Sequence, residues 1–192
     1  SASEAIDFDD LILRPVRFLA ADAELRAKWQ QRFRAVLVDE YQDTNATQLE
    51  LVRLLAGEHG NVCVVGDDDQ SIYGWRGACI ENILEFERTF PDARTIKLTQ
   101  NYRSTGHILA CANGVIGHNT SRRDKELWTA SGEGEPVRVV TCKDNRSEAS
   151  FVAGQIHRLH EDLGLTWSEF GILFRASAQA ADLEEALRLA GI

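Results

Sequence analysis

The sequence predicts an α/β fold with parallel β-sheet, and two observations carry this prediction. Short apolar runs alternate along the chain with amphipathic stretches of ten or more residues, which is the pattern of βαβ units. Two of the apolar runs, at 35–38 and 62–65, end in acidic residues. Because open α/β sheets bind ligands at the carboxyl ends of their strands, these ends predict a binding site at one sheet edge.

The first half of the chain is expected to begin with helices. Apolar residues at helical spacing predict a helix over 4–19, kinked or broken near Pro15, and Asp22 can cap a second helix that ends near Trp29. Continuous apolar runs then predict strands and the periodic stretches between them predict helices, in the order strand 35–38, helix 46–56, strand 62–65 and helix 80–89.

The second half repeats the alternation after a turn at 90–92. Residues 117–135 contain glycine, asparagine, serine and charge with few apolar anchors, so they predict an irregular surface loop. The expected elements around this loop are strand 95–98, helix 106–116, strand 136–142, helix 147–163, strand 171–175 and helix 178–189.

Composition favours a cytoplasmic protein without a membrane segment. The 192 residues are 44% hydrophobic, enough for a sizeable core in one domain or two small ones. No apolar run approaches twenty residues and the amino terminus does not resemble a signal peptide, so we expect a soluble chain that is not exported. The four cysteines are widely spaced without a C-x-x-C pair, which predicts reduced thiols rather than disulfides or a zinc site.

The first acidic strand end lies in the motif VDEYQDTN at 38–45. A carboxylate pair there can divide the work of phosphoryl transfer: one carboxylate holds Mg²⁺, and the other orients or deprotonates the attacking water. The alternative is a pair that merely caps a loop. Asp43 and Thr44 are expected to shape the turn and cap the next helix, whereas Gln42 is left open between a signalling role and none.

The second acidic strand end opens the motif VGDDDQSIYGWRGA at 65–78. The adjacent carboxylates of 67–69 repel one another unless a cation or a nest of N–H groups partners them. Tyr73, Trp75 and Arg76 then form an aromatic and basic run, typical of a surface on which single-stranded nucleic acid stacks. The alternatives are packing for both aromatic residues and an internal ion pair for Arg76.

Together with QNYRST at 100–105, these motifs resemble the superfamily 1 DNA helicases of the UvrD/Rep/PcrA type. The resemblance extends over almost the whole chain, from DFDDL at 7–11 to the helix ending near Gly191. GDDDQSIYGWRGA and KELWT (125–129) lean toward the DNA helicase II branch.

The resemblance implies parts of two RecA-like parallel-sheet domains of a P-loop NTPase helicase core. Residues 1–92 would be the C-terminal part of the first domain. Residues 93–192 would be the N-terminal part of the second, ending before an accessory subdomain. The sequence contains no G-x-x-x-x-G-K-[ST] phosphate loop (Walker A). We therefore expect the chain to be an internal fragment of a larger enzyme.

The resemblance also implies site residues for ATP and Mg²⁺. Asp39 and Glu40 would coordinate Mg²⁺, with Glu40 also activating the water, and Gln70 would sense the γ-phosphate. Tyr102 would stack on adenine, and Arg103 would reach the γ-phosphate from the second domain. The alternatives are a loop amide for Gln70 and an arginine paired with a surface carboxylate for Arg103.

The function implied for the full-length protein is an ATP-dependent DNA helicase that moves 3′ to 5′ on single-stranded DNA and separates forked duplex. The isolated chain is expected to be inactive and, with a net charge of −9, to bind DNA poorly. Exposed sheet edges are expected to promote self-association. A non-catalytic scaffold or partner-binding module is the alternative, and a helicase–nuclease is a weaker one. Contact of the basic cluster 122–125 with a DNA backbone is a minor interpretation.

Overall fold

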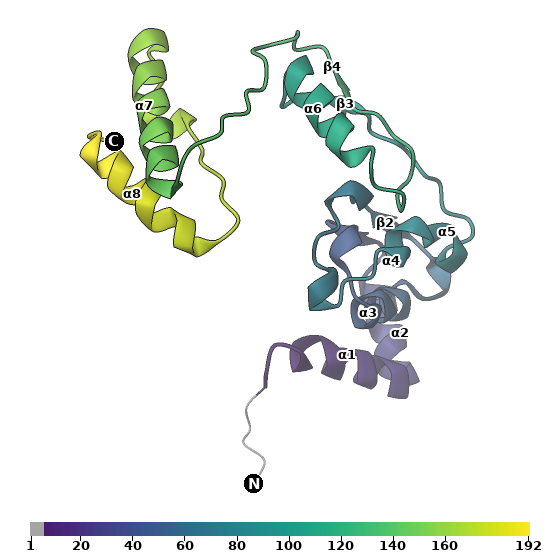
Figure 1. The fold of residues 1–192 in the computed structure, drawn as a ribbon. Coiled ribbons are helices and arrows are strands. Elements are labelled where there is room, and N and C mark those ends of the chain that lie inside the picture. Colours follow the sequence, from purple (N-terminus) through teal and green to yellow (C-terminus); the bar gives the residue numbers. More distant parts are fainter. Residues whose placement is uncertain (1–5) are drawn as a thin grey trace. The chain divides into compact units, whose positions relative to one another are not determined.

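The computed structural model describes residues 6–192 and contains two compact units, Ser1–Pro136 and Val137–Ile192. Helices and short parallel strands occur together, so the predicted α/β class is confirmed at this level (Figure 1). Among the described residues, no helix has the length and the apolar character needed to cross a membrane.

A βαβ unit forms the centre of the first unit. Strands β1 (Val36–Val38) and β2 (Val62–Val64) pair in parallel, with Leu37 opposite Cys63. Helix α3 (Ala46–Ala56) connects them and has the predicted bounds. The Asn45 side chain accepts from the Gln48 backbone N–H, and the Gln48 side chain accepts from the Asn45 backbone N–H, so a capping box sets the start of this helix.

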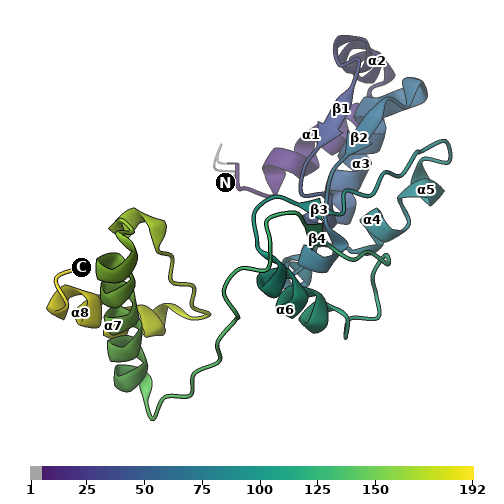
Figure 2. The ribbon, with the colours of Figure 1, turned by 90° about the horizontal axis from the view of Figure 1, so that it is seen from above.

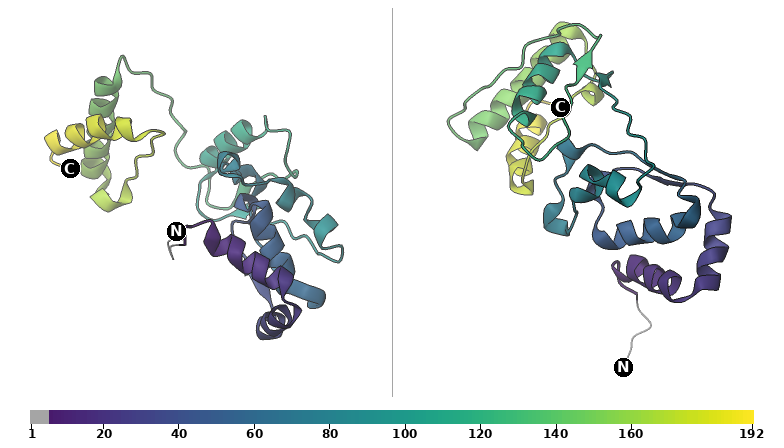
Figure 3. Two further views of the ribbon diagram at one scale, coloured as in Figure 1. Left: turned by 90° about the horizontal axis from the view of Figure 1, so that it is seen from below. Right: turned by 90° about the vertical axis from the view of Figure 1, so that its right-hand side faces the viewer.

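Helices α1 (Asp10–Ala21) and α2 (Ala23–Arg32) pack against α3 (Figure 3). Asp22 caps α2 as predicted, since its side chain accepts a hydrogen bond from the Leu25 backbone at 2.9 Å. The expected helix over 4–19 begins later, at Asp10, and continues through Pro15 without a break. Residues 4 and 5 lie outside the described part of the chain.

Short turns of helix follow the two strands of this unit. The 3₁₀ turns are η1 (Tyr41–Asp43), η2 (Gly57–His59), η3 (Asp68–Gln70) and η4 (Gly74–Arg76). The single helix predicted over 80–89 is instead two short helices, α4 (Glu81–Leu84) and α5 (Phe86–Thr89). Glu85 separates them with φ −109° and ψ 24°, which is outside the α-helical region.

A second, smaller parallel pair joins β3 (Gln100–Asn101) to β4 (Trp128–Thr129), and α6 (Gly106–Ile116) lies beside it (Figure 2). Helix α6 has its predicted bounds. The predicted strand over 95–98 is wrong, since pairing begins two residues beyond it, and the loop predicted over 117–135 contains β4. The strand partners are far apart in sequence, so a local apolar run does not reveal where they pair.

The second unit consists mainly of a helix pair. Helix α7 (Asn145–Leu163) packs on α8 (Ala180–Leu189), with the 3₁₀ turns η5 (Trp167–Glu169) and η6 (Ser177–Gln179) between them. The predicted strands over 136–142 and 171–175 are wrong, because neither segment pairs with another strand in the described chain. Several apolar side chains of these segments are exposed to solvent, and Leu173 is fully exposed.

Candidate nucleotide and nucleic-acid site

The first acidic strand end projects from the sheet on a strained backbone. Asp39 and Glu40 directly follow β1, and both side chains are exposed. Glu40 has φ 49° and ψ 42°, and within residues 6–192 it is the one non-glycine residue with positive φ. Such a conformation costs about 1–3 kcal/mol and persists where the surroundings impose it, typically at functional sites.

Gln42 ties the two strand ends together. Its side chain is almost completely buried at 1% exposure. Its amide Nε2 donates to the Glu40 carboxylate at 2.8 Å, and its Oε1 accepts from the Asp67 backbone N–H at 3.0 Å. A single buried amide therefore connects the carboxylate after β1 with the acidic turn after β2.

Glycine at position 66 makes this connection possible. A Cβ on Gly66 would lie 2.7 Å from Gln42 Oε1 and 2.9 Å from Ile83 Cδ1, closer than non-bonded atoms approach. The Tyr41 backbone N–H donates to the Val65 carbonyl at 3.0 Å in the same place. The two loops thus meet through backbone atoms and one amide, with no space for a side chain at Gly66.

The loop after β1 is also bonded to the start of α4. The Thr44 carbonyl accepts from the Cys79 backbone at 2.9 Å and from the Asn82 side chain at 3.0 Å. Thr44 is buried and its hydroxyl donates to the Tyr41 carbonyl at 2.7 Å, so it shapes the turn as predicted, while the helix cap itself is Asn45. The Tyr41 ring is fully buried against Phe86.

Basic side chains form ion pairs with the carboxylates of the acidic turn 67–69. Lys125 contacts all three carboxylates of Asp67, Asp68 and Asp69. Arg122 binds Asp69 with two parallel hydrogen bonds of 2.8 Å. Of the partners that the sequence left open for these carboxylates, a cation or a nest of N–H groups, the structure supplies cations from the predicted loop, and Asp68 is buried rather than solvated.

Gln70 is held at the exposed end of this turn. Its Nε2 donates to the second oxygen of Asp67 at 2.7 Å, which leaves the amide oxygen directed away from that bond. Burial raises the pKa of Asp67, but hydrogen bonds from Lys125 and Gln70 more than offset it, so the pKa lies below its usual value. Asp67 therefore remains ionised as an acceptor for the Gln70 amide.

The aromatic and basic run lies open to solvent. Trp75 is 73% exposed, so core packing does not account for it, and Tyr73 is partly exposed. The Arg76 guanidinium lies over the Trp75 ring at 4.5 Å and over the Tyr73 ring at 5.4 Å. Within residues 6–192, Arg76 thus makes cation–π contacts with both rings and forms no internal ion pair.

Tyr102 and Arg103 follow β3 and are exposed. The Tyr102 hydroxyl donates to the Gln100 side chain at 2.9 Å, and the Arg103 backbone N–H donates to Asn101 Oδ1 at 2.9 Å. Within the described residues the Arg103 guanidinium forms no ion pair, and it makes no hydrogen bond to Asp39, Glu40 or Gln70. The structure therefore brings together the two acidic strand ends, but not the tyrosine–arginine pair with them.

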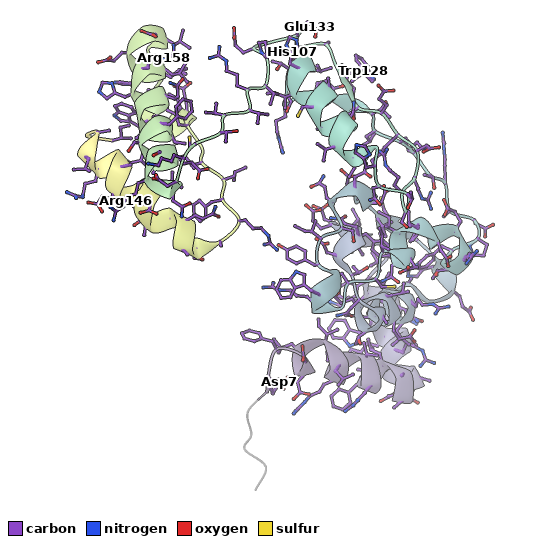
Figure 4. All side chains as sticks on the ribbon, in the orientation of Figure 1. Asp7, His107, Trp128, Glu133, Arg146 and Arg158 are labelled. Carbon is purple, nitrogen blue, oxygen red and sulfur yellow. The ribbon has the colours of Figure 1, made fainter. Side chains whose placement is uncertain are left out.

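The start of α6 supports the loop that carries this pair. The His107 backbone N–H donates to the Glu133 carbonyl at 2.9 Å, and the His107 ring contacts the Gly134 carbonyl at 2.9 Å. Figure 4 shows His107 at the start of α6 near Glu133. The segment after β4 thus holds the beginning of α6 in place.

The candidate metal ligands in this part of the chain are Asp39 and Glu40. Residues 6–192 contain no group of three or more His, Cys, Asp or Glu side chains arranged to hold a metal ion. Mg²⁺ in nucleotide sites usually takes one or two carboxylates and completes its shell with water and phosphate oxygens. The two exposed carboxylates after β1 fit that requirement.

Sequence reasoning missed two features of the site. It left Gln42 open between a signalling role and none and did not predict its buried bridge, because a single glutamine carries no sign of being buried. It gave the cations of 122–125 no partner within the chain and a DNA backbone only as a minor interpretation, whereas Arg122 and Lys125 bind the acidic turn. The signal was present in the opposite charges of DDD at 67–69 and RRDK at 122–125, but their spatial proximity was not visible.

Comparison with known proteins places both halves of the chain in one family. Residues 1–91 match the UvrD/REP helicase N-terminal domain, and residues 96–192 match the UvrD-like helicase C-terminal domain. The chain is 49% identical over 185 residues to the ATP-dependent DNA helicase PcrA of Staphylococcus epidermidis and of Staphylococcus aureus. It is 45% identical over 185 residues to that of Leuconostoc citreum.

These alignments cover 96% of this chain but 25% of each relative, so the chain spans about a quarter of the length of the curated relatives it matches. The two domain matches adjoin each other and together include every motif described above. The chain therefore belongs to the UvrD-like helicase family.

Proposed function

We propose that this chain is part of an ATP-dependent DNA helicase that couples ATP hydrolysis to movement along single-stranded DNA. The observation that carries the proposal is the Gln42 bridge, which joins Glu40 after one strand to the turn that holds Gln70 after the next. Acidic groups suited to Mg²⁺ and water, and an amide suited to a phosphate, thus share one edge of a parallel sheet.

Each residue of the site has a proposed role. Asp39 and Glu40 would hold Mg²⁺, which supplies charge neutralisation to the phosphates when bound. Glu40 orients and deprotonates the attacking water, and Gln70 contacts the γ-phosphate, because an amide can accept from water and donate to phosphate. Tyr102 stacks on adenine, and Arg103 neutralises charge that grows on the γ-phosphate.

Arg103 is exposed and free of ion pairs in the described chain, which supports a role that begins only when nucleotide is present. An arginine that reaches the phosphate from a second domain makes closure of the cleft depend on ATP. We therefore propose that residues 1–92 and 93–192 are parts of two RecA-like domains of a larger cytoplasmic protein. The adjoining domain matches support a division in this region.

The DNA contact is proposed for the surface of Tyr73, Trp75 and Arg76. Exposed aromatic rings stack on any base, which suits a protein that moves along DNA without sequence preference. The surface begins three residues after Gln70, so a change at the phosphate has a short route to the strand. Movement in the 3′ to 5′ direction and opening of forked duplex are part of the proposal, on the strength of the family.

The test is ATP hydrolysis by a full-length protein that carries this sequence, with and without single-stranded DNA. Strong stimulation by DNA is expected. The 192-residue chain alone should show no turnover, because it lacks a G-x-x-x-x-G-K-[ST] loop to cradle the phosphates. Absence of hydrolysis by the full-length protein under both conditions would favour a non-catalytic scaffold instead.

A further inference from the structure

A cluster of opposite charges joins the acidic turn 67–69 to the segment 122–125. We propose that Lys125, assisted by Arg122, is a positioning residue for Gln70: it holds the turn in the shape that directs the Gln70 amide. The inference deepens the proposed function and rests on it, since it assumes that Gln70 acts in ATP hydrolysis.

Lys125 is connected to Gln70 through the carboxylate of Asp67, which contacts both side chains. Lys125 Nζ lies 2.9 Å from one oxygen of Asp67, and the other oxygen of Asp67 accepts from Gln70 Nε2 at 2.7 Å. The Lys125 side chain is only 14% exposed, so it has little freedom to leave. Gln70 is thus oriented by a carboxylate whose own position depends on Lys125.

Charge balance explains why the turn needs Lys125. Asp68 is 6% exposed, and a buried carboxylate must be paired and hydrogen-bonded to remain charged. It contacts Lys125 Nζ and accepts from the Arg123 backbone N–H at 2.7 Å. Lys125 Nζ also lies 3.0 Å from Asp69, which Arg122 binds on both oxygens.

Without Lys125, three adjacent carboxylates would face a single side-chain cation, that of Arg122. The remaining cation nearby is already committed, since the Arg123 guanidinium binds Glu87 and donates to the Leu84 carbonyl at 2.8 Å. Repulsion among the carboxylates would then open the turn or protonate one of them. Either change would release the hydrogen bond between Asp67 and Gln70.

The contact between Lys125 and Asp67 also joins the segments of the chain that match the two family domains. Lys125 and Arg122 lie in the stretch matched by the C-terminal domain, whereas Asp67 and Gln70 lie in the stretch matched by the N-terminal domain. The orientation of the phosphate-sensing amide therefore depends on a residue of the following domain segment. In this structure the cations of 122–125 already bind carboxylates and carbonyls, which disfavours a DNA backbone as their primary partner.

The test is steady-state ATP hydrolysis by the full-length protein with saturating single-stranded DNA. Lys125→Met keeps the length of the side chain and removes its charge, and kcat is expected to fall about 100-fold, the size typical of a misplacement by about 1 Å. Binding of a non-hydrolysable ATP analogue should change less than about threefold. Lys125→Arg should restore most of kcat. The matched control is Lys28→Met, which alters an exposed lysine of α2.

A second arm separates positioning from folding. The double variant Lys125→Met/Asp68→Asn removes one charge of each sign, so it should melt near the wild-type temperature, yet it should keep the low kcat because Asp67 still lacks the direct contact with Lys125 that fixes its position. Adding Lys125→Met to Gln70→Ala should lower kcat no further, because both act through one amide. Wild-type kcat in a folded Lys125→Met or in the double variant would overturn the inference. Lack of DNA-stimulated hydrolysis in the wild type would overturn the proposed function instead.

Discussion

Glu40 holds a left-handed backbone conformation at the end of β1, and its carboxylate is bonded to the buried Gln42 amide. A glycine or asparagine would adopt this backbone with less strain. A glutamate at a strained position is therefore a candidate for a function of its carboxylate. The same buried amide limits the directions in which that carboxylate can turn, so a water bound to it would be held in a defined place.

Replacing Glu40 with glutamine tests the proposal that its carboxylate is the base. Glu40→Gln keeps the size of the side chain and a hydrogen-bond acceptor for Gln42, but it cannot take a proton from water. In the full-length protein we expect ATP turnover to fall by about 10²–10⁴-fold with nucleotide binding preserved. Turnover assays and binding of a fluorescent ATP analogue measure the two effects. Glu58→Gln, at an exposed glutamate, is the control, and turnover above a tenth of wild type would contradict the assignment.

Trp75 presents an exposed ring that Arg76 orders by cation–π contact. Loss of the ring in Trp75→Ala should weaken binding of single-stranded DNA by about 1–3 kcal/mol, the usual contribution of one stacked base. Basal ATP hydrolysis should change much less than its stimulation by DNA. Fluorescence anisotropy with labelled oligonucleotides measures the affinity. Trp167→Ala removes an aromatic ring from the second unit and should leave DNA affinity unchanged.

Elements of the first unit meet through backbone atoms where the loops after β1 and β2 touch. Gly66 lies at the closest point, against Gln42 and Ile83. Because packed interiors have little room to adjust, the contact between these two loops should be disturbed by the addition of a single methyl group at Gly66.

Gly66→Ala should therefore destabilise the chain by about 1–3 kcal/mol, the usual cost of overpacking. Urea unfolding followed by circular dichroism measures the change in the free energy of unfolding. Gly114→Ala is the matched control: it lies within α6 with nothing within 4 Å of the added carbon. Since alanine favours helix over glycine, that variant should gain about 0.5–1 kcal/mol. Equal stability of the two variants would refute the close contact.

Helix α5 is tied to the segment 122–125 by an ion pair between Glu87 and Arg123. Hydrogen bonds from Arg123 and from the Thr95 hydroxyl lower the pKa of Glu87 from 4.5 to about 2. A carboxyl whose pKa is lower in the folded state stabilises the fold above its unfolded pKa, and this contribution disappears as the pH falls through the folded pKa.

The chain should thus lose the Glu87 contribution between about pH 4.5 and pH 2. Glu87→Gln should flatten the pH dependence of the free energy of unfolding in that window, with little slope left from this residue. Thermal unfolding at a series of pH values measures it. Glu85→Gln, which alters a neighbouring exposed ion pair with Arg88, serves as the comparison. An unchanged slope for Glu87→Gln would show that the ion pair does not persist in solution.

At the scale of the whole molecule, the described chain leaves sheet edges unpaired. Each of the two sheets has only two strands, so every strand is an edge. Leu37 on β1 is 76% exposed although the flanking sequence is that of a buried strand. Open edges with apolar neighbours are templates for pairing with another chain.

We expect the 192-residue chain to self-associate as its concentration rises, through these edges. Light scattering after size-exclusion chromatography over a range of concentrations measures the effect. Leu37→Lys should reduce association, because a charge on an edge strand opposes pairing. Leu189→Lys, which places the same charge on the exposed face of α8, should not. A strictly monomeric wild-type chain at high concentration would refute the expectation.

Local sequence determined the elements whose signals are local. Helices α3 and α6 have the predicted bounds, Asp22 caps α2, and the valine-rich runs before the acidic motifs became β1 and β2. Capping and helical periodicity depend on residues within a few positions of each other, so a reader of the sequence can see them. The acidic motifs also predicted the candidate site, and their resemblance predicted the helicase family.

Tertiary structure decided everything that depends on partners far apart in the chain. The apolar runs at 95–98, 136–142 and 171–175 form no strand, because a strand exists only where a neighbour accepts and donates its hydrogen bonds. The bridge made by Gln42, and the pairing of Lys125 with the acidic turn, likewise join distant segments. The sequence alone therefore predicted the acidic, amide and aromatic groups of the candidate site, and the fold determined which of them meet.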